Sequence, residues 1–327
     1  MADQRIDILC YALDRWDDLK TANAFLDQPP FDARLTKIFP VQATVISNCH
    51  YTLAQIWAGK NYHVAQNNCS IPEKFDFAAT FPEKDKVSAF YQLRSLLLKM
   101  KKNAEFIAIA HNEAGGKRLS KWLAEMGCDI IDEITKYHCR AVRASAPEDI
   151  SKEILQGQYK GPHGLVTQAG IFGADKIDAG SALLLNNLPQ RLTGKIADFG
   201  CGYGYLTHAL KDHGAEICAY DDDCRAVSAT SVNVPEAKTI WWDLTVQPYE
   251  APFDAIIMNP PFHEGKKESV GLGQKLIEVA ALSLKKGGAL YMVANRHLPY
   301  EKILTQHFAA FTLLAEEKGF KVYKAMK

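Results

Sequence analysis

Two short segments in the second half of the chain carry residue types that could perform chemistry. The first is Asp198-Phe199-Gly200-Cys201-Gly202-Tyr203-Gly204, where three glycines alternate with larger residues behind an acid. Glycines that follow a strand let the backbone approach a ligand closely, and the start of the next helix offers free amides. A dinucleotide-binding loop uses the spacing Gly-x-Gly-x-x-Gly, with an acid about 20 residues later. The spacing here instead favours a cofactor with an amino-acid end, whose ammonium group Asp198 would contact.

The glycine loop and three acids form a predicted cofactor site. Asp221 ends a predicted strand and would accept hydrogen bonds from ribose hydroxyls. Asp243 ends the next strand, where it could contact an adenine amino group or, equally, cap a turn. The alternative for the loop itself is simple strand-to-helix packing, which also uses glycine-rich turns. We predict S-adenosylmethionine as the cofactor, held by Asp198, Gly200, Gly202, Gly204, Asp221, Asp243 and Asn259.

The second segment is Asn259-Pro260-Pro261-Phe262, which follows a predicted strand and so lies at the ligand-binding edge of a sheet. Its two prolines stiffen the loop and keep Asn259 extended. The side-chain carbonyl of Asn259 and the backbone carbonyl of Pro260 could then accept hydrogen bonds from one amino group, while Phe262 stacks on a planar substrate. Two fixed acceptors favour the nucleophilic form of an aromatic amine, and positioning adds to the rate. We therefore predict methyl transfer to a planar amino nitrogen with Asn259, Pro260 and Phe262 as catalytic residues. The alternative is a rigid turn with a buried Phe.

Other polar residues give weaker signals. His263 and Lys266 extend the loop beyond Phe262, although such a stretch is usually a solvated loop. Arg296 is a further candidate for contact with RNA. The predicted substrate-binding residues are therefore Phe262, His263, Lys266 and Arg296. The eight cysteines form no Cys-x-x-Cys pair and the histidines have no partners at metal-ligand spacing, so we predict no metal.

Alternating strands and helices must position these motifs. Apolar patterns and turn signals predict strands over 195–198, 216–220, 239–242, 254–258 and 289–294, and helices over 205–213, 224–232 and 272–284. Strands that alternate with helices imply a doubly wound, mostly parallel sheet in an α/β fold. Segments 311–315 and 320–325 flank Glu317-Lys318-Gly319 and predict a C-terminal antiparallel hairpin that closes the sheet.

The first half of the chain predicts a second copy of this fold. It holds a strand over 105–110 and a helix over 117–126. When this region is shifted by 87 positions, Gly115, Leu119, Leu123, Gly127 and Ile130 coincide with Gly202, Leu206, Leu210, Gly214 and Ile217. The chemical residues do not follow the pattern, since His111 takes the place of Asp198 and Lys117 that of Gly204. We predict a degenerate domain over 1–148 without a cofactor site and a catalytic domain over 149–327, with the boundary in 143–149.

Composition narrows the class of protein. The 327 residues are 47% hydrophobic and 23% charged, which is typical of a globular chain long enough for two cores. No apolar run is long enough to cross a bilayer and the N-terminus lacks a signal-peptide pattern, so we expect a cytoplasmic protein that contacts no membrane. The number of lysines plus arginines equals the number of aspartates plus glutamates, 38 each. This neutral balance neither indicates nor excludes a nucleic-acid partner.

Several segments together resemble the ribosomal small-subunit methyltransferase C family. The resemblance is dense in the second half of the chain and thin before about residue 75. The segments are Ile171-Phe172, Asp178-Ala179-Gly180-Ser181-x-Leu183-Leu184, Asp198 to Gly204, Asn259-Pro260-Pro261-Phe262-His263-Glu264-Gly265, Val293-Ala294-Asn295-x-x-Leu298-Pro299-Tyr300, Gly319-Phe320-Lys321-Val322-Tyr323-Lys324-Ala325, Phe81-Pro82-x-Lys84-x-Lys86, Gln92-Leu93 and Asn112-Glu113.

The resemblance implies two tandem Rossmann-like class I methyltransferase domains, of which only the second binds cofactor. It also implies methyl transfer to the exocyclic N2 of a guanine in 16S ribosomal RNA (rRNA), on the assembled small ribosomal subunit. In that family pattern, Asp198, Gly200, Gly202, Asp221 and Asp243 would hold the cofactor, and Asn259, Pro260 and Phe262 the guanine. We expect a monomer and direct transfer without a covalent enzyme intermediate.

Three alternatives stay open at this point. A large-subunit rRNA guanine-N2 methyltransferase has the same architecture. A glutamine or adenine-amine methyltransferase shares the Asn-Pro-Pro-aromatic device, usually with Tyr at the position of Phe262. A non-catalytic ribosome-assembly factor could retain the fold, although the intact glycines, the acids and Asn259 weigh against it.

Overall fold

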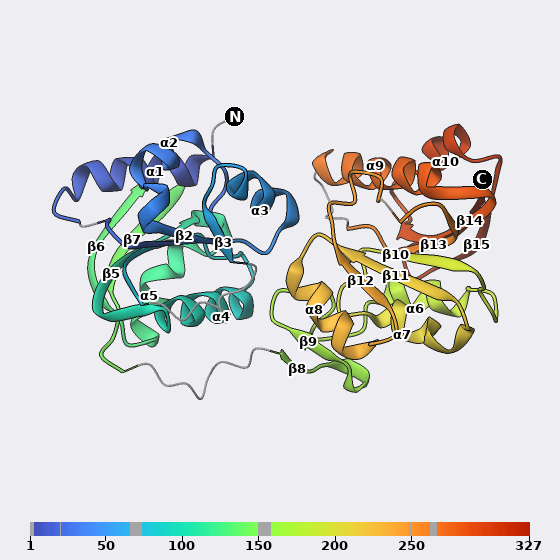
Figure 1. Ribbon diagram of the computed structural model, residues 1–327, viewed down its shortest axis with the longest axis horizontal. Helices are drawn as coiled ribbons and strands as arrows, with labels where there is room; N and C mark the ends of the chain where they lie inside the picture. The colour runs from blue at the N-terminus through green and yellow to red at the C-terminus, as the bar shows by residue number, and fades with distance from the viewer. Residues whose placement is uncertain (1–2, 20, 66–73, 150–157, 249, 262–266) are drawn as a thin grey trace. The chain divides into compact units, whose positions relative to one another are not determined.

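Each half of the chain builds one twisted seven-stranded sheet with helices on both faces (Figure 1). The computed structural model describes residues 3–19, 21–65, 74–149, 158–248, 250–261 and 267–327. Contacts divide the chain into two units, 1–157 and 158–327. No helix in these described ranges is both long and apolar enough to span a membrane.

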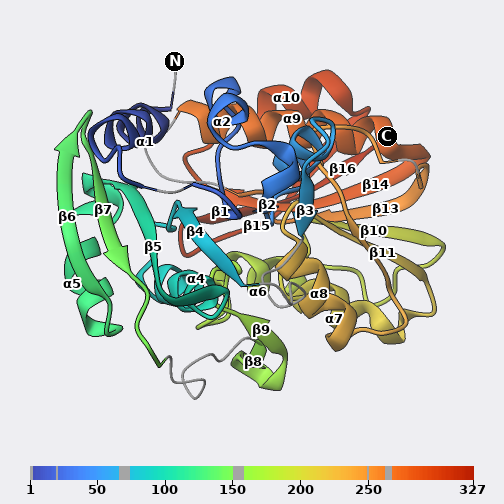
Figure 2. The same cartoon turned by 60° about the vertical axis from the view of Figure 1, so that its left-hand side comes forward.

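The first unit has the strand order β3-β2-β1-β4-β5-β7-β6. Its strands are β1 (Ala24–Asp27), β2 (Thr44–Ser47), β3 (His63–Ala65), β4 (Phe75–Thr80), β5 (Met100–His111), β6 (Asp129–Lys136) and β7 (Cys139–Ser145), and its helices are α1 (Gln4–Arg15), α2 (Ala33–Ile38), α3 (Tyr51–Ala58), α4 (Lys86–Leu97) and α5 (Leu119–Glu125). Helices α1, α2 and α3 cover one face of the sheet, and α4 and α5 cover the other (Figure 1). Figure 2 shows β5, β7 and β6 side by side at the antiparallel edge.

The second unit repeats this order as β12-β11-β10-β13-β14-β16-β15. Its strands are β10 (Lys195–Phe199), β11 (Glu216–Asp221), β12 (Lys238–Trp241), β13 (Phe253–Met258), β14 (Leu284–Asn295), β15 (Ala310–Glu317) and β16 (Phe320–Met326), and its helices are α6 (Ala179–Asn186), α7 (Tyr205–Leu210), α8 (Cys224–Asn233), α9 (Lys267–Ser283) and α10 (Glu301–His307). Helices α6, α7 and α8 lie on one face, and α9 and α10 on the other (Figure 1). A small hairpin of β8 (Gln158–Lys160) and β9 (Val166–Gln168) precedes the sheet.

The predicted α/β class and the C-terminal hairpin are confirmed. Strands β10 to β14 pair in parallel, and β16 pairs antiparallel with both β14 and β15. The predicted helix over 272–284 ends at Ser283 in the structure. Strand β14 begins directly after it, at Leu284, and Gly287 and Gly288 lie within β14, where the pairing with β13 shifts register. Gly287 has a φ of 80°, which suits the bend.

The second copy of the fold exists, but the predicted 87-residue offset between the copies is wrong. Segment 105–110 belongs to β5, which occupies the place of β14 in the sheet order and not that of β10. The counterpart of β10 is β1, and the loop after it starts at Gln28. The offset failed because strand–turn–helix units recur throughout an α/β fold, so five matching residues do not decide which unit is which.

Candidate functional site

A pocket opens in the second unit where the order of the strands reverses. Strand β10 pairs with β11 on one side and β13 on the other, so the loops after β10 and β13 leave the sheet at the same edge. This is where doubly wound sheets bind ligands. The residues that line the pocket come from these two loops, the start of α7 and the region around the start of α6: Phe172, Gly173, Asp178, Ser181, Gly200, Cys201, Gly202, Tyr203, Tyr205, Leu206 and Asn259.

The three glycines of the loop have two different surroundings. Gly200 and Gly202 have φ values of 78° and 56°. A Cβ on Gly200 would meet no protein atom within 4 Å, and one on Gly202 would have only the Phe172 carbonyl oxygen at 3.8 Å. A Cβ on Gly204 would lie 2.9 Å from the hydroxyl oxygen of Thr230. The first two glycines therefore face open space, whereas Gly204 permits close packing of α7 against α8.

Asp198 is a fully buried acid with half of its carboxylate unused. Its Oδ2 accepts a hydrogen bond of 2.6 Å from the Thr207 hydroxyl, and its side chain is 0% exposed. Its Oδ1 is buried without a hydrogen-bond partner among the residues that the structure describes. Burial raises the pKa of Asp198 to about 7, helped by the neighbouring charge of Asp221. A cation placed beside Oδ1 would restore the charged form.

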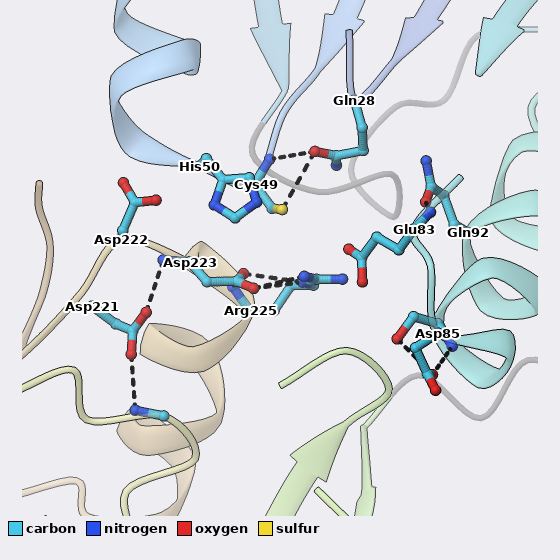
Figure 3. A network of polar contacts seen from close by, with 12 residues as sticks. Gln28, Cys49, His50, Glu83, Asp85, Gln92, Asp221, Asp222, Asp223 and Arg225 are labelled. Carbon is cyan, nitrogen blue, oxygen red and sulfur yellow. Dashed lines mark hydrogen bonds and ion pairs between the residues drawn. The ribbon is translucent and has the colours of Figure 1, made fainter. Parts of the chain in front are cut away.

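Asp221 ends β11, and two backbone amides hold its carboxylate in place. Its Oδ2 accepts from the Gly202 amide and its Oδ1 from the Asp223 amide, each at 2.9 Å (Figure 3). Burial raises the pKa of Asp221 to about 6 in spite of these bonds. The Gly202 bond ties the glycine loop to the end of the neighbouring strand.

Among the predicted site residues that the structure describes, the pocket is lined by Gly200, Gly202 and Asn259 but not by Asp198, Gly204, Asp221, Asp243 or Arg296. Asp243 lies two residues beyond β12, and its Oδ1 accepts from the Thr245 amide and hydroxyl at 2.8 and 2.7 Å. The turn-capping alternative for Asp243 therefore describes what this side chain does here. Arg296 lies after β14 and forms an ion pair of 2.7 Å with Glu316 on β15. Its charge is partly balanced by that partner.

Asn259 follows β13 and faces the start of α6. Its Nδ2 donates to Asp178 Oδ2 at 2.9 Å and to Ser181 Oγ at 2.8 Å. Its Oδ1 is buried and has no partner within the described part of the chain. Pro260 is buried beside it. The predicted residues Phe262, His263 and Lys266 fall in 262–266, outside the described residues.

The pocket contains several residues to which the sequence pattern assigned no chemistry. Asp178 and Ser181 contact Asn259 directly, and Phe172 lines the pocket with 64% of its surface exposed. Tyr203 and Tyr205 supply further aromatic surface. The one sequence signal that could have pointed to Asp178 and Ser181 is their spacing, Asp-x-x-Ser before an apolar run. This spacing is typical of a helix N-cap and by itself indicates only the start of a helix.

One group of possible metal ligands lies away from this pocket. The ligand atoms of Glu216, Cys218 and Glu250 lie within 4.8 Å of one another. Glu250 is, however, already paired with Lys195 at 3.0 Å and with Lys238. These two ammonium groups balance its charge, so the group is explained without an ion.

The pocket, together with the two acids next to its glycine loop, suits a ligand that carries an ammonium group and hydroxyls. The unused Asp198 oxygen can accept from the ammonium, and the open surface over Gly200 and Gly202 lets the ligand lie against the backbone. The Asp221 carboxylate lies beside Gly202, from whose amide it accepts a hydrogen bond. S-Adenosylmethionine has this distribution of groups.

Comparison with known proteins also indicates a methyltransferase. A family model described as "Methyltransferase small domain" matches residues 163–324. A "Ribosomal RNA small subunit methyltransferase C" of Shewanella pealeana is 30% identical over 293 residues, which cover 85% of each chain. Its namesake from Chromohalobacter salexigens is 30% identical over 311 residues, 91% of this chain and 92% of the other. A solved T. thermophilus 16S rRNA N2 G1207 methyltransferase, in complex with AdoMet and guanosine, has a TM-score of 0.78 at 22% identity over 93% of this chain and 88% of its own. That structure has the same two-unit fold.

Proposed function

This chain belongs to the ribosomal RNA small subunit methyltransferase C family, and we propose that it methylates the exocyclic N2 of a guanine in 16S rRNA. The observation that carries the proposal is the Oδ1 of Asn259, which is buried at the edge of the pocket and has no hydrogen-bond partner among the residues that the structure describes. A buried acceptor without a donor costs free energy, about 1–3 kcal/mol, and an amino group of the substrate would remove that cost.

In this proposal the glycine loop and its acids hold S-adenosylmethionine. Asp198 accepts from the ammonium group, Gly200 and Gly202 let the cofactor lie against the backbone, and Asp221 accepts from the ribose hydroxyls. When bound, the cofactor supplies an electrophilic methyl group, whose transfer to an amino nitrogen leaves S-adenosylhomocysteine and releases one proton. Gly204 acts through packing, and Asp243 holds the turn that borders the adenine.

The substrate amino group lies between two acceptors of the chain. Asn259 Oδ1 and the Pro260 carbonyl each accept one N–H of the guanine, which directs the nitrogen lone pair away from the ring plane and toward the methyl group. Phe262 stacks on the base, and a paired guanine must first leave its helix to reach the pocket. Loss of one such pre-organised contact typically costs about 100- to 1,000-fold in rate.

The wider setting of the proposal is the small ribosomal subunit in the cytoplasm, with the enzyme acting as a monomer. His263, Lys266 and Arg296 are the proposed contacts to RNA around the target guanine. We further propose that residues 1–148 form a domain that binds no cofactor and that residues 149–327 form the catalytic domain. The strand order, which is the same in both units, supports a duplication of this kind.

Mass spectrometry of rRNA tests the proposal. Cells that lack the protein should lack one N2-methylguanine in 16S rRNA, and expression of the intact chain should restore it, while the Asn259→Ala variant should not. A missing methyl group in 23S rRNA would favour the large-subunit alternative instead. If S-adenosylmethionine shows no binding by calorimetry at millimolar concentration, the chain is not an enzyme of this kind.

A further inference from the structure

The side-chain amide of Asn259 is held by two groups from a different part of the chain. Asp178 and Ser181 belong to the start of α6, about eighty residues earlier, and both accept from Asn259 Nδ2. An amide nitrogen carries two hydrogens, so these contacts use both of its donor positions. The remaining atom, Oδ1, is the buried acceptor of the proposed substrate amino group.

The carboxylate of Asp178 decides which way this amide points. An ionised carboxylate can only accept hydrogen bonds, whereas the hydroxyl of Ser181 can either accept or donate. If the amide were rotated by half a turn, its oxygen would face the Asp178 carboxylate and two acceptors would repel each other. Ser181 alone would tolerate either orientation. The acid therefore selects the orientation that leaves Oδ1 available.

Asp178 is itself held firmly by its place in the fold. It is the N-cap of α6, and its Oδ2 accepts from the Ser181 amide at 2.7 Å. Gly180 lies between them, and a Cβ there would lie 3.1 Å from both Asp178 Oδ2 and the ring of Phe320 on β16. The first turn of α6 can therefore approach the sheet closely. The carboxylate is fixed by the start of α6, which does not belong to the Asn259 loop.

From this arrangement we infer that Asp178, assisted by Ser181, is a positioning residue for methyl transfer, acting through Asn259. This inference rests on the proposed function, because it assigns the cause of the orientation of the acceptor in that reaction. It adds α6 to the catalytic architecture and makes the acceptor pre-organised before the substrate arrives. Neither residue needs to touch the cofactor or the base.

The test compares Asp178→Asn with a matched change elsewhere in the chain. Asparagine is also a good N-cap, so α6 should form, but its amide can donate or accept and no longer selects one orientation of Asn259. Asp85 of the first unit is the control, since it caps α4 with the same Asp-x-x-Ser spacing and accepts from the Ser88 amide at 2.9 Å (Figure 3). Asp85→Asn removes the same charge from the same kind of cap.

We expect Asp178→Asn to lower the single-turnover rate of methyl transfer to small ribosomal subunits from cells lacking the protein by roughly 10- to 100-fold. The Asp178→Asn and Asp85→Asn variants should have the same dissociation constant for S-adenosylmethionine and the same unfolding midpoint. The rate of methyl transfer by Asp85→Asn should equal that of the intact enzyme. Ser181→Ala keeps the backbone cap and should lose about two- to tenfold in rate. It also serves as the second variant if Asp178→Asn does not fold, and a Ser181→Ala rate equal to that of the intact enzyme would then overturn the inference.

Two further results would overturn the positioning role. One is a rate for Asp178→Asn equal to that for Asp85→Asn. The other is a parallel loss of cofactor affinity, which would make Asp178 part of the cofactor site. If the intact enzyme itself transfers no methyl group, the proposed function fails before the inference is reached, so the two failures are distinguishable.

Discussion

The loop after β1 in the first unit and the loop after β10 in the second make the same backbone contact. Their residue types differ. The Gly200 amide donates to the Tyr220 carbonyl at 2.9 Å, and the Gln28 amide donates to the Ser47 carbonyl at 2.8 Å, which is the same contact in each sheet order. Both residues have positive φ, 78° and 54°. In the second unit these positions read Gly200-Cys201-Gly202, whereas in the first they read Gln28-Pro29-Pro30.

In the first unit, the chain's own side chains hold this loop. Gln28 Oε1 accepts from the Cys49 amide at 3.1 Å (Figure 3), and the indole of Trp57 donates to the Pro29 carbonyl at 3.4 Å. Trp57 is fully buried. A fold can therefore keep its strand order and its turns while its own side chains replace the contacts that a cofactor would make.

Asn48 in the first unit and Asp221 in the second lie at equivalent positions, but their side chains make hydrogen bonds of opposite direction to the neighbouring loop. Asn48 follows β2 as Asp221 ends β11, and each accepts from the amide two residues on, at 3.0 and 2.9 Å. Asp221 also accepts from the Gly202 amide, whereas Asn48 donates to the Pro29 carbonyl at 3.3 Å. Proline has no amide to offer, so an acceptor-only carboxylate would have no donor there.

The largest effect is expected from changes at Asn259, which follows β13, and at Phe81, which follows β4 at the equivalent place in the first unit. Asn259→Ala should lower the rate of methyl transfer by roughly 100- to 1,000-fold with unchanged cofactor binding, because a substrate acceptor is lost. Phe81→Ala should instead destabilise the first unit by about 3–5 kcal/mol, because Phe81 is a buried core residue. Single-turnover kinetics and urea unfolding separate the two outcomes. A rate for Asn259→Ala above a tenth of that of the intact enzyme would refute the assigned role.

Gly200→Gln gives the second unit the residue that the first unit carries in the same turn. We expect the dissociation constant for S-adenosylmethionine to rise roughly 100-fold, since the side chain enters the open space above the loop. The fold should survive at a cost of about 1–2 kcal/mol, as Gln28 shows that glutamine can adopt this backbone conformation. Calorimetry measures the affinity, and Gln28→Gly is the control that should not change it. Unchanged binding by Gly200→Gln would mean that the cofactor lies elsewhere.

Asp221→Asn imitates Asn48. The variant should keep its turn, because Asn48 makes the same bond with the amide two residues on. Its affinity for S-adenosylmethionine should fall by roughly 10- to 100-fold, the range expected when charge-assisted hydrogen bonds of about 1.5–3 kcal/mol are lost. Calorimetry against S-adenosylmethionine and against methionine locates the loss, since only the former has a ribose. A similar loss for both ligands would contradict the ribose assignment.

Titration of Asp198 should set how the stability and the cofactor affinity of the second unit depend on pH. Its folded pKa of about 7 lies above the ordinary value of 3.8, so the stability that it provides below about pH 4 is lost as the pH rises through 7. Without cofactor, the free energy of unfolding should therefore fall from pH 5 to pH 8. Affinity for the cofactor ammonium should rise over the same range as Asp198 ionises, by up to roughly 90-fold. Asp198→Asn should flatten both curves, apart from a slope near pH 6 from Asp221. A variant that keeps the full slope would exclude Asp198 as its source.

The smallest expected effect concerns Arg296, whose place in the first unit is taken by Asn112. Their amides make the same contact across the hairpin turn, with the Gly319 and His138 carbonyls. Arg296→Asn should weaken binding to 16S rRNA by only about two- to threefold, because the exposed guanidinium is already shared with Glu316. Filter binding at fixed salt measures it, with Glu316→Gln as the partner that should strengthen binding slightly. A loss beyond tenfold would make Arg296 a major RNA contact.

Much of the second unit follows from local patterns. The strands around Asp198, Asp221 and Asn259 and the C-terminal hairpin were all predicted, because apolar periods and turn residues act over a few positions. The first unit was predicted less well. Its first strand, Ala24–Asp27, is followed by Gln28 and two prolines, and without a glycine motif nothing in the sequence marks it as the counterpart of β10.

The sequence by itself determined the residue types of the site: an acid before a glycine loop, an acid after the next strand and an Asn-Pro-Pro loop. Tertiary structure alone decided how they act. It buried Asp198 and raised its pKa, and it brought Asp178 from α6 to orient the Asn259 amide. These effects depend on desolvation and on contacts between segments far apart in the chain. No pattern of neighbouring residues encodes them.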